Sequence, residues 1–198
     1  MSERNWVEEL DKYKYKLSIL EEHEPTFHRF NYRNDLTSKL SNDYPQYQRK
    51  SYLIMLVSLF EDFMNQLCRS VEVDLDIKVS FTDFTGSGIE RAKLYLSKLS
   101  TLSLPVSGAE WTQIKDAQAI CNVIAHAAGY IDKKTHSKQL KVIDWNDNLV
   151  VEQYARTHLN INSEYVFDLI IAMKIFTNKL LIACKKLPST EINKNTQQ

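Results

Sequence analysis

The sequence has few of the residues that turn a chain, with four glycines and four prolines in 198 residues. An all-β protein needs many tight turns, so this scarcity argues against one. The 25 Lys and Arg residues are balanced by 25 Asp and Glu residues. The protein therefore has no overall positive charge that would attract nucleic acid. Any such binding would need a local patch of basic residues. The longest apolar run, YLIMLVSLF, ends at Glu61 and is shorter than the roughly 20 residues that span a bilayer.

Cysteine is also scarce, and the three cysteines, Cys68, Cys121 and Cys184, lie far apart in apolar helical runs. They form no CxxC pair and no metal-ligand spacing, so we expect reduced, buried thiols and no metal site. Walker-type, GxGxxG, GxSxG and HExxH motifs are absent, and we expect no cofactor. The first residues, MSERNWVEELDK, are acidic and polar, unlike a signal peptide. These features predict a cytoplasmic protein that does not bind a membrane.

Apolar residues recur at helical spacing along most of the chain. Residues 3–23 carry a single apolar stripe, formed by Trp6, Leu10, Tyr13, Leu17 and Leu20. A second, less regular helix is expected to about residue 40, followed by a break at the turn-forming sequence SNDYP, residues 41–45. Residues 47–71 form the strongest predicted helix, which is apolar nearly all round at its start and should be central. Its one polar stripe contains Ser58, Glu61 or Asp62, Asn65 and Arg69.

Three more helices are predicted at residues 88–100, 109–129 and 163–186, the first of them capped by Ser87. A β-hairpin is expected before the last helix, with LKVIDW and LVVEQ on either side of NDN and HLNIN as a third short strand. The predicted fold is therefore mainly all-α: a bundle of five or six helices with one small hairpin. We expect a single domain over residues 1–186, with its core in 45–186, and a disordered polar tail at 187–198.

The helix at 109–129 contains an unusual stretch, DAQAICNVIAHAAGYI, residues 116–131. Asn122 and His126 lie one turn apart on a narrow face of small or polar groups, opposite the apolar side. One interpretation is a hydrogen-bonded surface pair, worth a few tenths of a kcal/mol. The other is a site on a face that a second copy of the same helix can approach closely.

The sequence CNVIAHAAGYI resembles the signature helix of the HEPN superfamily, whose pattern is Arg-Asn, three residues and then His. Asn122 and His126 match this pattern, whereas Cys121 stands in place of the arginine. SYLIMLVSLFEDFMNQL resembles the helix with a buried acidic residue in the RiboL-PSP, or RNase LS-like, group, and GIERAKLYLSKL resembles the helix that follows it there. The resemblance covers roughly residues 45–185.

The resemblance implies a HEPN-fold homodimer that meets through the 109–129 helix and acts on RNA. It further implies metal-independent cleavage by a toxin or antiphage module, which an antitoxin or other partner protein would accompany. In that chemistry the ribose 2′-OH attacks the adjacent phosphorus and leaves a 2′,3′-cyclic phosphate. His126 would transfer protons, because its ordinary pKa lies near neutrality, and Asn122 would orient the histidine or the phosphate.

The missing arginine would have stabilised the charge on the phosphorus centre. Cys121 cannot replace it, since a thiol is short and largely neutral, and we expect it to be buried. Other cations that could serve are Arg69 and the lysines of IDKKTHSKQLK, namely Lys133, Lys134 and Lys138. That segment is either a solvated loop or a contact for an RNA backbone. Glu61 is either the acidic group of the cleft or an exposed helix carboxylate.

Three functions remain open from the sequence. The first is a HEPN ribonuclease, weakened or non-standard because of Cys121. The second is a catalytically inactive HEPN domain that binds RNA or a partner protein. The third is a helical dimeric adaptor with no nucleic-acid role, which the zero net charge favours.

Overall fold

The computed structural model describes residues 11–12, 14–15, 35–100, 102–153 and 157–185. The fold is mainly helical, with a two-stranded antiparallel hairpin before the last helix, which confirms the predicted fold class. In chain order the elements are α2 (Asp35–Asp74), the 3-10 helix η2 (Phe81–Asp83), α3 (Gly88–Leu99), α4 (Ala109–Ala127), α5 (Ser137–Asp144), β1 (Leu149–Gln153), β2 (Thr157–Ile161) and α6 (Ser163–Cys184).

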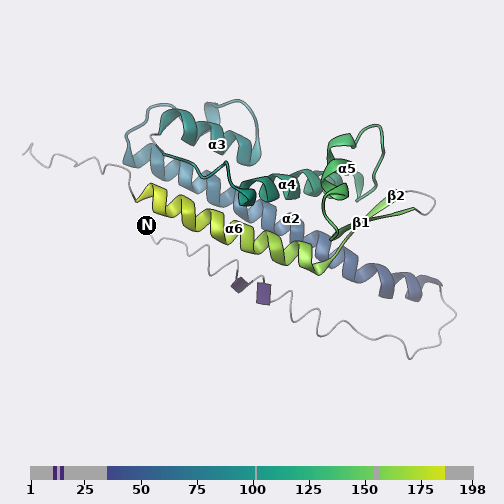
Figure 1. Ribbon diagram of the computed structural model, residues 1–198. Helices are drawn as coiled ribbons and strands as arrows, with labels where there is room; N and C mark the ends of the chain where they lie inside the picture. Colours follow the sequence, from purple (N-terminus) through teal and green to yellow (C-terminus); the bar gives the residue numbers. More distant parts are fainter. Residues whose placement is uncertain (1–10, 13, 16–34, 101, 154–156, 186–198) are drawn as a thin grey trace, which may run out of the picture.

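Three helices form the body of the molecule. Figure 1 shows α2 and α6 running in the same direction, with α4 running the opposite way along α2 and α3 lying over the C-terminal half of α2. The contacts agree with this direction, because Gly129, just beyond the end of α4, lies against Lys50, whereas Gln118 lies near Glu61. The middle and the C-terminal end of α4 are therefore placed at known levels along α2.

An aromatic cluster joins these three helices at the centre of the core. Phe176 of α6 meets Phe60 of α2 edge-on, with ring centroids 5.6 Å apart, and stacks on Trp111 of α4 at 5.2 Å. Phe176 has no exposed surface, and the other two side chains are nearly as buried. Aromatic pairs at these separations add to the stabilisation that burial itself provides. The cluster fixes how α4 sits between its neighbours.

The helix predicted at 47–71 is confirmed, but the break predicted at residues 41–45 is wrong. α2 runs without interruption from Asp35 to Asp74 and contains Pro45. A proline removes one backbone hydrogen bond and crowds the preceding turn, which often bends a helix rather than ending it. Immediately after the proline, the side-chain carbonyl of Gln46 accepts a hydrogen bond from the Ile161 backbone N–H at 2.9 Å. This contact ties that part of α2 to the hairpin.

The hairpin is present, but its first strand was predicted in the wrong place. LKVIDW falls largely in α5, which ends at Asp144, whereas the strands that pair are β1 and β2, with Leu149 opposite Ile161. Ile143 is buried and Trp145 is 90% exposed, so the apparent alternation did not mark a sheet face. A six-residue apolar run cannot by itself distinguish a strand from a short helix. HLNIN, predicted as an extra strand, provides the second strand of the hairpin.

The other predicted helices are confirmed within a few residues as α3, α4 and α6. Ser87 occupies the N-cap position of α3, although its side chain makes no capping hydrogen bond. Most of the helix predicted at 3–23, and the tail at 187–198, lie outside the described residues. Among the described helices, none is both long and apolar enough to cross a membrane.

Candidate functional site

The polar face of α4 lies on the surface of the chain. Asn122 and His126 are exposed, and so are the small residues Ala125 and Ala128 beside them. The opposite face of the helix is in the core, with Trp111, Ile114, Ala117, Ile120, Cys121, Val123 and Ile124 buried. The predicted division of this helix into an apolar side and a narrow polar side is therefore confirmed. The Asn122–His126 pair is open to solvent or to a second molecule.

Gly129 is buried just beyond the end of the helix. α4 ends at Ala127, and the chain turns through Ala128 (φ 50°) and Gly129 (φ 80°), both in the left-handed region. The Gly129 N–H donates to the Val123 carbonyl at 3.2 Å, which closes the last turn. A Cβ at Gly129 would come within 3.3 Å of the Lys50 ammonium nitrogen. The left-handed conformation favours glycine here, and the close approach of Lys50 adds to that preference.

Backbone hydrogen bonds join the residues that follow α4 to the hairpin. The Leu159 N–H donates to the Gly129 carbonyl at 2.9 Å, and the Ile131 N–H donates to the Thr157 carbonyl at 3.0 Å. Tyr130 and His158 are paired between these bonds, and their rings meet edge-on with centroids 5.2 Å apart. The backbone that follows His126 is therefore held by β2. The C-terminal end of α4 is therefore anchored to the hairpin.

Lys50 is buried beneath this junction, with 4% of its surface exposed. Its Nζ lies 3.3 Å from both ring nitrogens of His158, so one hydrogen bond can form with whichever nitrogen accepts. Burial lowers the pKa of Lys50 to about 8, and the nearby charges of Asp43 and Glu152 oppose part of that shift. Lysine is rarely so buried. Its amine is accordingly much easier to deprotonate than that of a surface lysine.

Glu61 lies between three helices. A Cβ added at Gly88, the first residue of α3, would be 3.4 Å from the Glu61 Oε2 and 2.9 Å from the Gln118 amide nitrogen. Glu61 is partly buried rather than fully exposed. This carboxylate therefore faces α4 near Gln118, one turn before Asn122. Of the two interpretations left open by the sequence, an acidic group turned toward the motif helix fits this position better.

Cys121 occupies the position where the resemblance would place arginine. Its side chain is 8% exposed, which confirms the predicted burial. Burial raises the pKa of the thiol, and the negative charge of Glu61 raises it further. The thiol is therefore neutral at pH 7 and supplies no positive charge to the α4 face.

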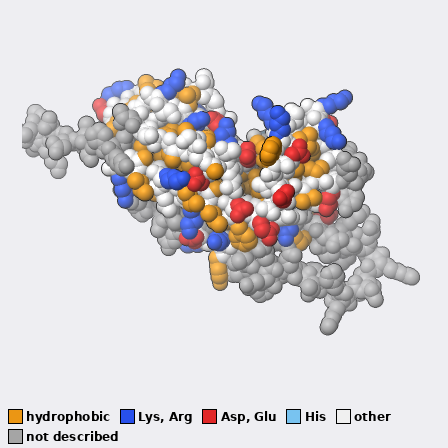
Figure 2. Space-filling model, in the orientation of Figure 1, with side chains coloured by type: hydrophobic (Ala, Val, Ile, Leu, Met, Phe, Trp, Pro, Cys, Tyr) orange, Lys and Arg blue, Asp and Glu red, His pale blue; other side chains and the backbone are white. Residues whose placement is uncertain are grey.

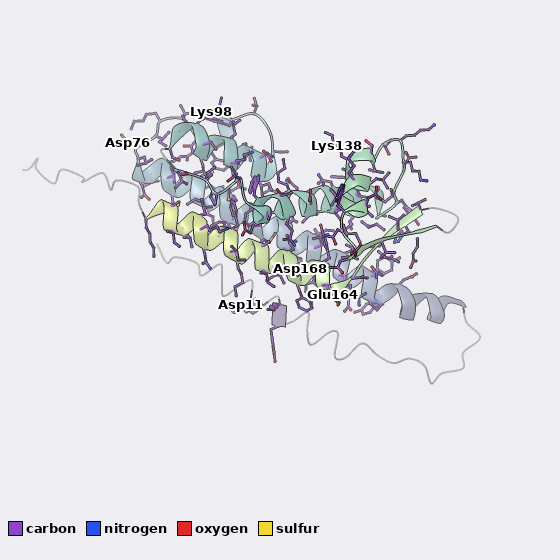
Figure 3. All side chains as sticks on the ribbon, in the orientation of Figure 1. Asp11, Asp76, Lys98, Lys138, Glu164 and Asp168 are labelled. Carbon is purple, nitrogen blue, oxygen red and sulfur yellow. The ribbon has the colours of Figure 1, made fainter. Side chains whose placement is uncertain are left out.

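The predicted lysines lie beyond the end of α4, on the surface. Lys133, Lys134 and Lys138 are exposed, and Figure 3 shows Lys138 at the start of α5. The segment between α4 and α5 is organised by Asp132, whose carboxylate accepts hydrogen bonds from the backbone N–H groups of Lys134 at 2.7 Å and Thr135 at 3.0 Å. These bonds lower the pKa of Asp132.

The surface around α5 is mixed in charge rather than uniformly basic. On the face drawn in Figure 2, Lys and Arg side chains project around α5 with Asp and Glu side chains between them. Such a surface could contact phosphates at individual lysines, but it does not form a continuous basic stripe.

Arg69 is not brought close to Asn122 and His126 within the chain. It lies 19 residues beyond Lys50 on α2, about 28 Å of helix rise, whereas the end of α4 lies at the level of Lys50. Its guanidinium sits 5.7 Å from the centroid of the Phe81 ring. At this distance it has a local cation–π partner.

Lys50 and His158 were not selected from the sequence as site residues. The sequence did contain a pattern that includes Lys50. Residues 50, 53, 57, 60, 64 and 68 follow one another at spacings of three and four, as on one side of a helix, and the structure shows that all are buried. Lys50 is the polar member of that stripe. His158 had no comparable signal, since its pairing with Tyr130 depends on how the hairpin meets α4.

No protein-family model matches the chain, and neither a curated protein nor a solved structure does. Within the described residues no group of three or more His, Cys, Asp or Glu side chains is arranged to hold a metal ion.

Proposed function

We propose that this chain is an RNA-directed protein of the HEPN type. Two α4 faces would form one groove in a homodimer, and His126 would support weak, metal-independent cleavage of RNA. The observation that carries the proposal is the Asn122–His126 pair, exposed on a helix whose opposite side is buried. Ala125 and Ala128 beside the pair leave room for a second helix. A two-fold axis there would bring each His126 near its copy.

The proposed reaction begins when the 2′-oxygen of a ribose attacks the adjacent phosphorus and the 5′-oxygen of the next nucleotide leaves. One His126 would accept the 2′-OH proton, and the copy in the second protomer would donate a proton to the leaving oxygen. General acid–base help of this kind is worth about 10²- to 10⁴-fold. Asn122, one turn earlier on the same exposed face, would hold the imidazole or a phosphate oxygen.

The activity should be weak because the motif position has no cation. Removal of one charge-stabilising donor from a reaction of this kind costs on the order of 10²- to 10³-fold. Cys121 is buried and its thiol has a raised pKa. This observation also favours the second candidate function, an inactive HEPN domain that binds RNA or a partner protein. A toxin or antiphage setting would suit either candidate.

One assay distinguishes the candidates. Purified protein is incubated with mixed RNA in EDTA, alongside the variants His126→Ala, Asn122→Ala and Cys121→Arg. Thr112→Ala, at an exposed position earlier on the same helix, is the matched control. Circular dichroism checks that every variant is folded, which matters most for Cys121→Arg because that position is buried.

Cleavage by the wild type and Thr112→Ala that disappears in His126→Ala would support the ribonuclease. Cleavage seen only in Cys121→Arg would support the inactive domain, with Glu61 placed to pair with the new guanidinium. No cleavage and no salt-sensitive retention of RNA in any folded variant would contradict both and leave the helical adaptor.

A further inference from the structure

Trp145 is the most exposed large apolar side chain in the part of the chain that the structure describes. It is 90% exposed, whereas Trp111, the other tryptophan in that part, is 4% exposed. Tryptophan is normally highly buried, because its large ring gains much from leaving water. A single exposed apolar side chain often has no role, so the surroundings of Trp145 decide whether it has one.

The backbone that carries this ring is held on both sides. The Trp145 N–H donates to the Lys141 carbonyl at 3.3 Å, which closes the last turn of α5, and the Asn146 N–H donates to the Ile143 carbonyl at 3.1 Å. Ile143 and Leu149, on either side of this turn, are buried. The indole ring therefore projects into solvent from an anchored turn. A ring mounted in this way loses little conformational freedom when it binds a ligand.

Two exposed lysines lie on the same side of α5 as Trp145. Lys138 and Lys141 precede it by seven and four residues, spacings that align side chains along one face of a helix. Along the helix axis they lie about 10 and 6 Å from Trp145. Asp144 is also exposed, but it lies about 100° around the helix from Trp145, and the exposed Asp147 follows the turn. The face that carries the ring is therefore positively charged.

An exposed aromatic ring in line with cations fits a single-stranded nucleic acid better than a membrane. Every base has a flat face that can stack on an indole ring, and the neighbouring phosphates can pair with lysines. The surface around α5 as a whole is mixed in charge, so phosphate contacts alone would hold RNA weakly and stacking would supply much of the affinity. A membrane would need an apolar face to insert, but that face of α5, with Leu140 and Ile143, packs on the core.

We propose that Trp145, Lys138 and Lys141 form a platform for single-stranded RNA, where one base stacks on the indole ring and the lysines hold neighbouring phosphates. This inference rests on the proposed function, in which RNA is the ligand. α5 packs against α4, whose last turn carries His126 (Figure 1). The platform holds a strand near that end of α4, and it selects unpaired bases because a base inside a duplex has no free face.

Fluorescence anisotropy of a labelled oligouridylate, about 12 nucleotides long, tests the platform. Every protein carries His126→Ala, so that the RNA stays intact. Trp145→Ala is compared with Trp145→Tyr, which keeps an aromatic face, and with Tyr47→Ala, which removes an exposed aromatic ring from α2. A second oligonucleotide of the same length has abasic sugars, so it keeps the phosphates and lacks the bases. Circular dichroism checks that each variant is folded.

We expect Trp145→Ala to bind oligouridylate about 5- to 100-fold more weakly than the His126→Ala protein. Trp145→Tyr and Tyr47→Ala should stay within about three-fold of it. On the abasic strand Trp145→Ala should lose no affinity, since no base is left to stack. This difference between the two strands separates a stacking role of Trp145 from a general effect on the surface.

Unchanged binding of oligouridylate by Trp145→Ala, or an equal loss on both strands, would overturn the platform and leave the proposed function standing. No binding of either strand by any folded protein at low salt would contradict both. Anionic phosphatidylserine vesicles that bind the His126→Ala protein but not Trp145→Ala, with no effect of Trp145 on RNA, would also overturn the platform. That outcome would make a lipid surface the partner.

Discussion

The ammonium nitrogen of Lys50 lies 3.3 Å from both ring nitrogens of His158, beside Gly129, which follows the C-terminal end of α4. The pair joins α2 to the second strand of the hairpin, and backbone hydrogen bonds of Gly129 and Leu159 lie directly beside it. A lysine is an expensive residue to bury at this place, because its charged form loses most of its hydration. This loss of hydration is the main reason that the pKa of Lys50 is lowered to about 8.

Lys50→Met should therefore make the protein more stable at pH 7. The pKa of Lys50 is 10.5 when unfolded and about 8 when folded, so between these values the unfolded chain binds the proton and the folded chain does not. The free energy of unfolding then rises with pH across this window and is lowest below it. Methionine fills a similar volume and has no charge to desolvate. In this variant both the desolvation penalty and the rise in the free energy of unfolding with pH should disappear.

Urea unfolding at pH 7 and pH 9.5 measures this effect, with Lys98→Met at an exposed position as the control. The control should follow the wild type at both pH values. A Lys50→Met protein that loses stability at pH 7, or that keeps the wild-type rise with pH, would show that the contact with His158 outweighs burial of the charge.

Phe176→Ala should lower the free energy of unfolding by about 3–5 kcal/mol. The Phe176 side chain is fully buried and contacts Phe60 and Trp111, so its removal leaves a cavity at the point where three helices meet. Trp145→Ala removes an aromatic ring that is 90% exposed and should change stability by less than about 0.5 kcal/mol. Chemical denaturation of the two variants gives the comparison. Similar losses in both would mean that the cluster does not hold the helices together.

The long helices could be predicted from the sequence because their apolar residues recur over many turns. α4 is an example, since the burial of Ile114, Ile120 and Cys121 and the exposure of Asn122 and His126 follow from one helical wheel. Short segments could not be assigned in this way. LKVIDW alternates like a strand for too few residues, and its place in α5 depends on which side packs on the core.

Contacts between distant segments also could not be predicted. Lys50 and His158 are 108 residues apart, and nothing local in either sequence indicates the other. The left-handed conformation of Gly129, by contrast, is a local property of the end of α4, whereas the tight space around its Cα is set by Lys50. Site residues that depend on tertiary packing therefore become visible only in the folded chain.

If RNA follows the surface beyond α4, the lysines there should set its salt dependence. Replacing Lys133, Lys134 and Lys138 together with glutamine removes three exposed charges and should reduce the slope of log affinity against log salt by about 2 for single-stranded RNA. The double variant Lys78→Gln and Lys98→Gln, exposed elsewhere, is the control and should leave the slope unchanged. Filter binding at several salt concentrations provides the measurement. Equal slopes for both variants would place the RNA on another surface.

Ala125→Glu should convert the proposed dimer to a monomer. Ala125 is exposed between Asn122 and His126 on the face where the second α4 would pack, and a two-fold axis would bring two new carboxylates together in a restricted space. We expect the dissociation constant of the dimer to rise at least about 10²-fold, since a like-charge contact at an interface costs several kcal/mol. Sedimentation equilibrium of the wild type and the variant measures the change.

Thr112→Glu, also exposed but near the start of the same helix, controls for the added charge and should leave the dimer intact. Any RNA cleavage should be lost along with the dimer, because a single protomer supplies one histidine where the reaction needs an acid and a base. A wild type that is monomeric at all concentrations, or an Ala125→Glu protein that still dimerises, would contradict the proposal of a groove shared between two α4 helices. The exposed Asn122–His126 pair would then be only a surface pair on a helix whose opposite side is buried.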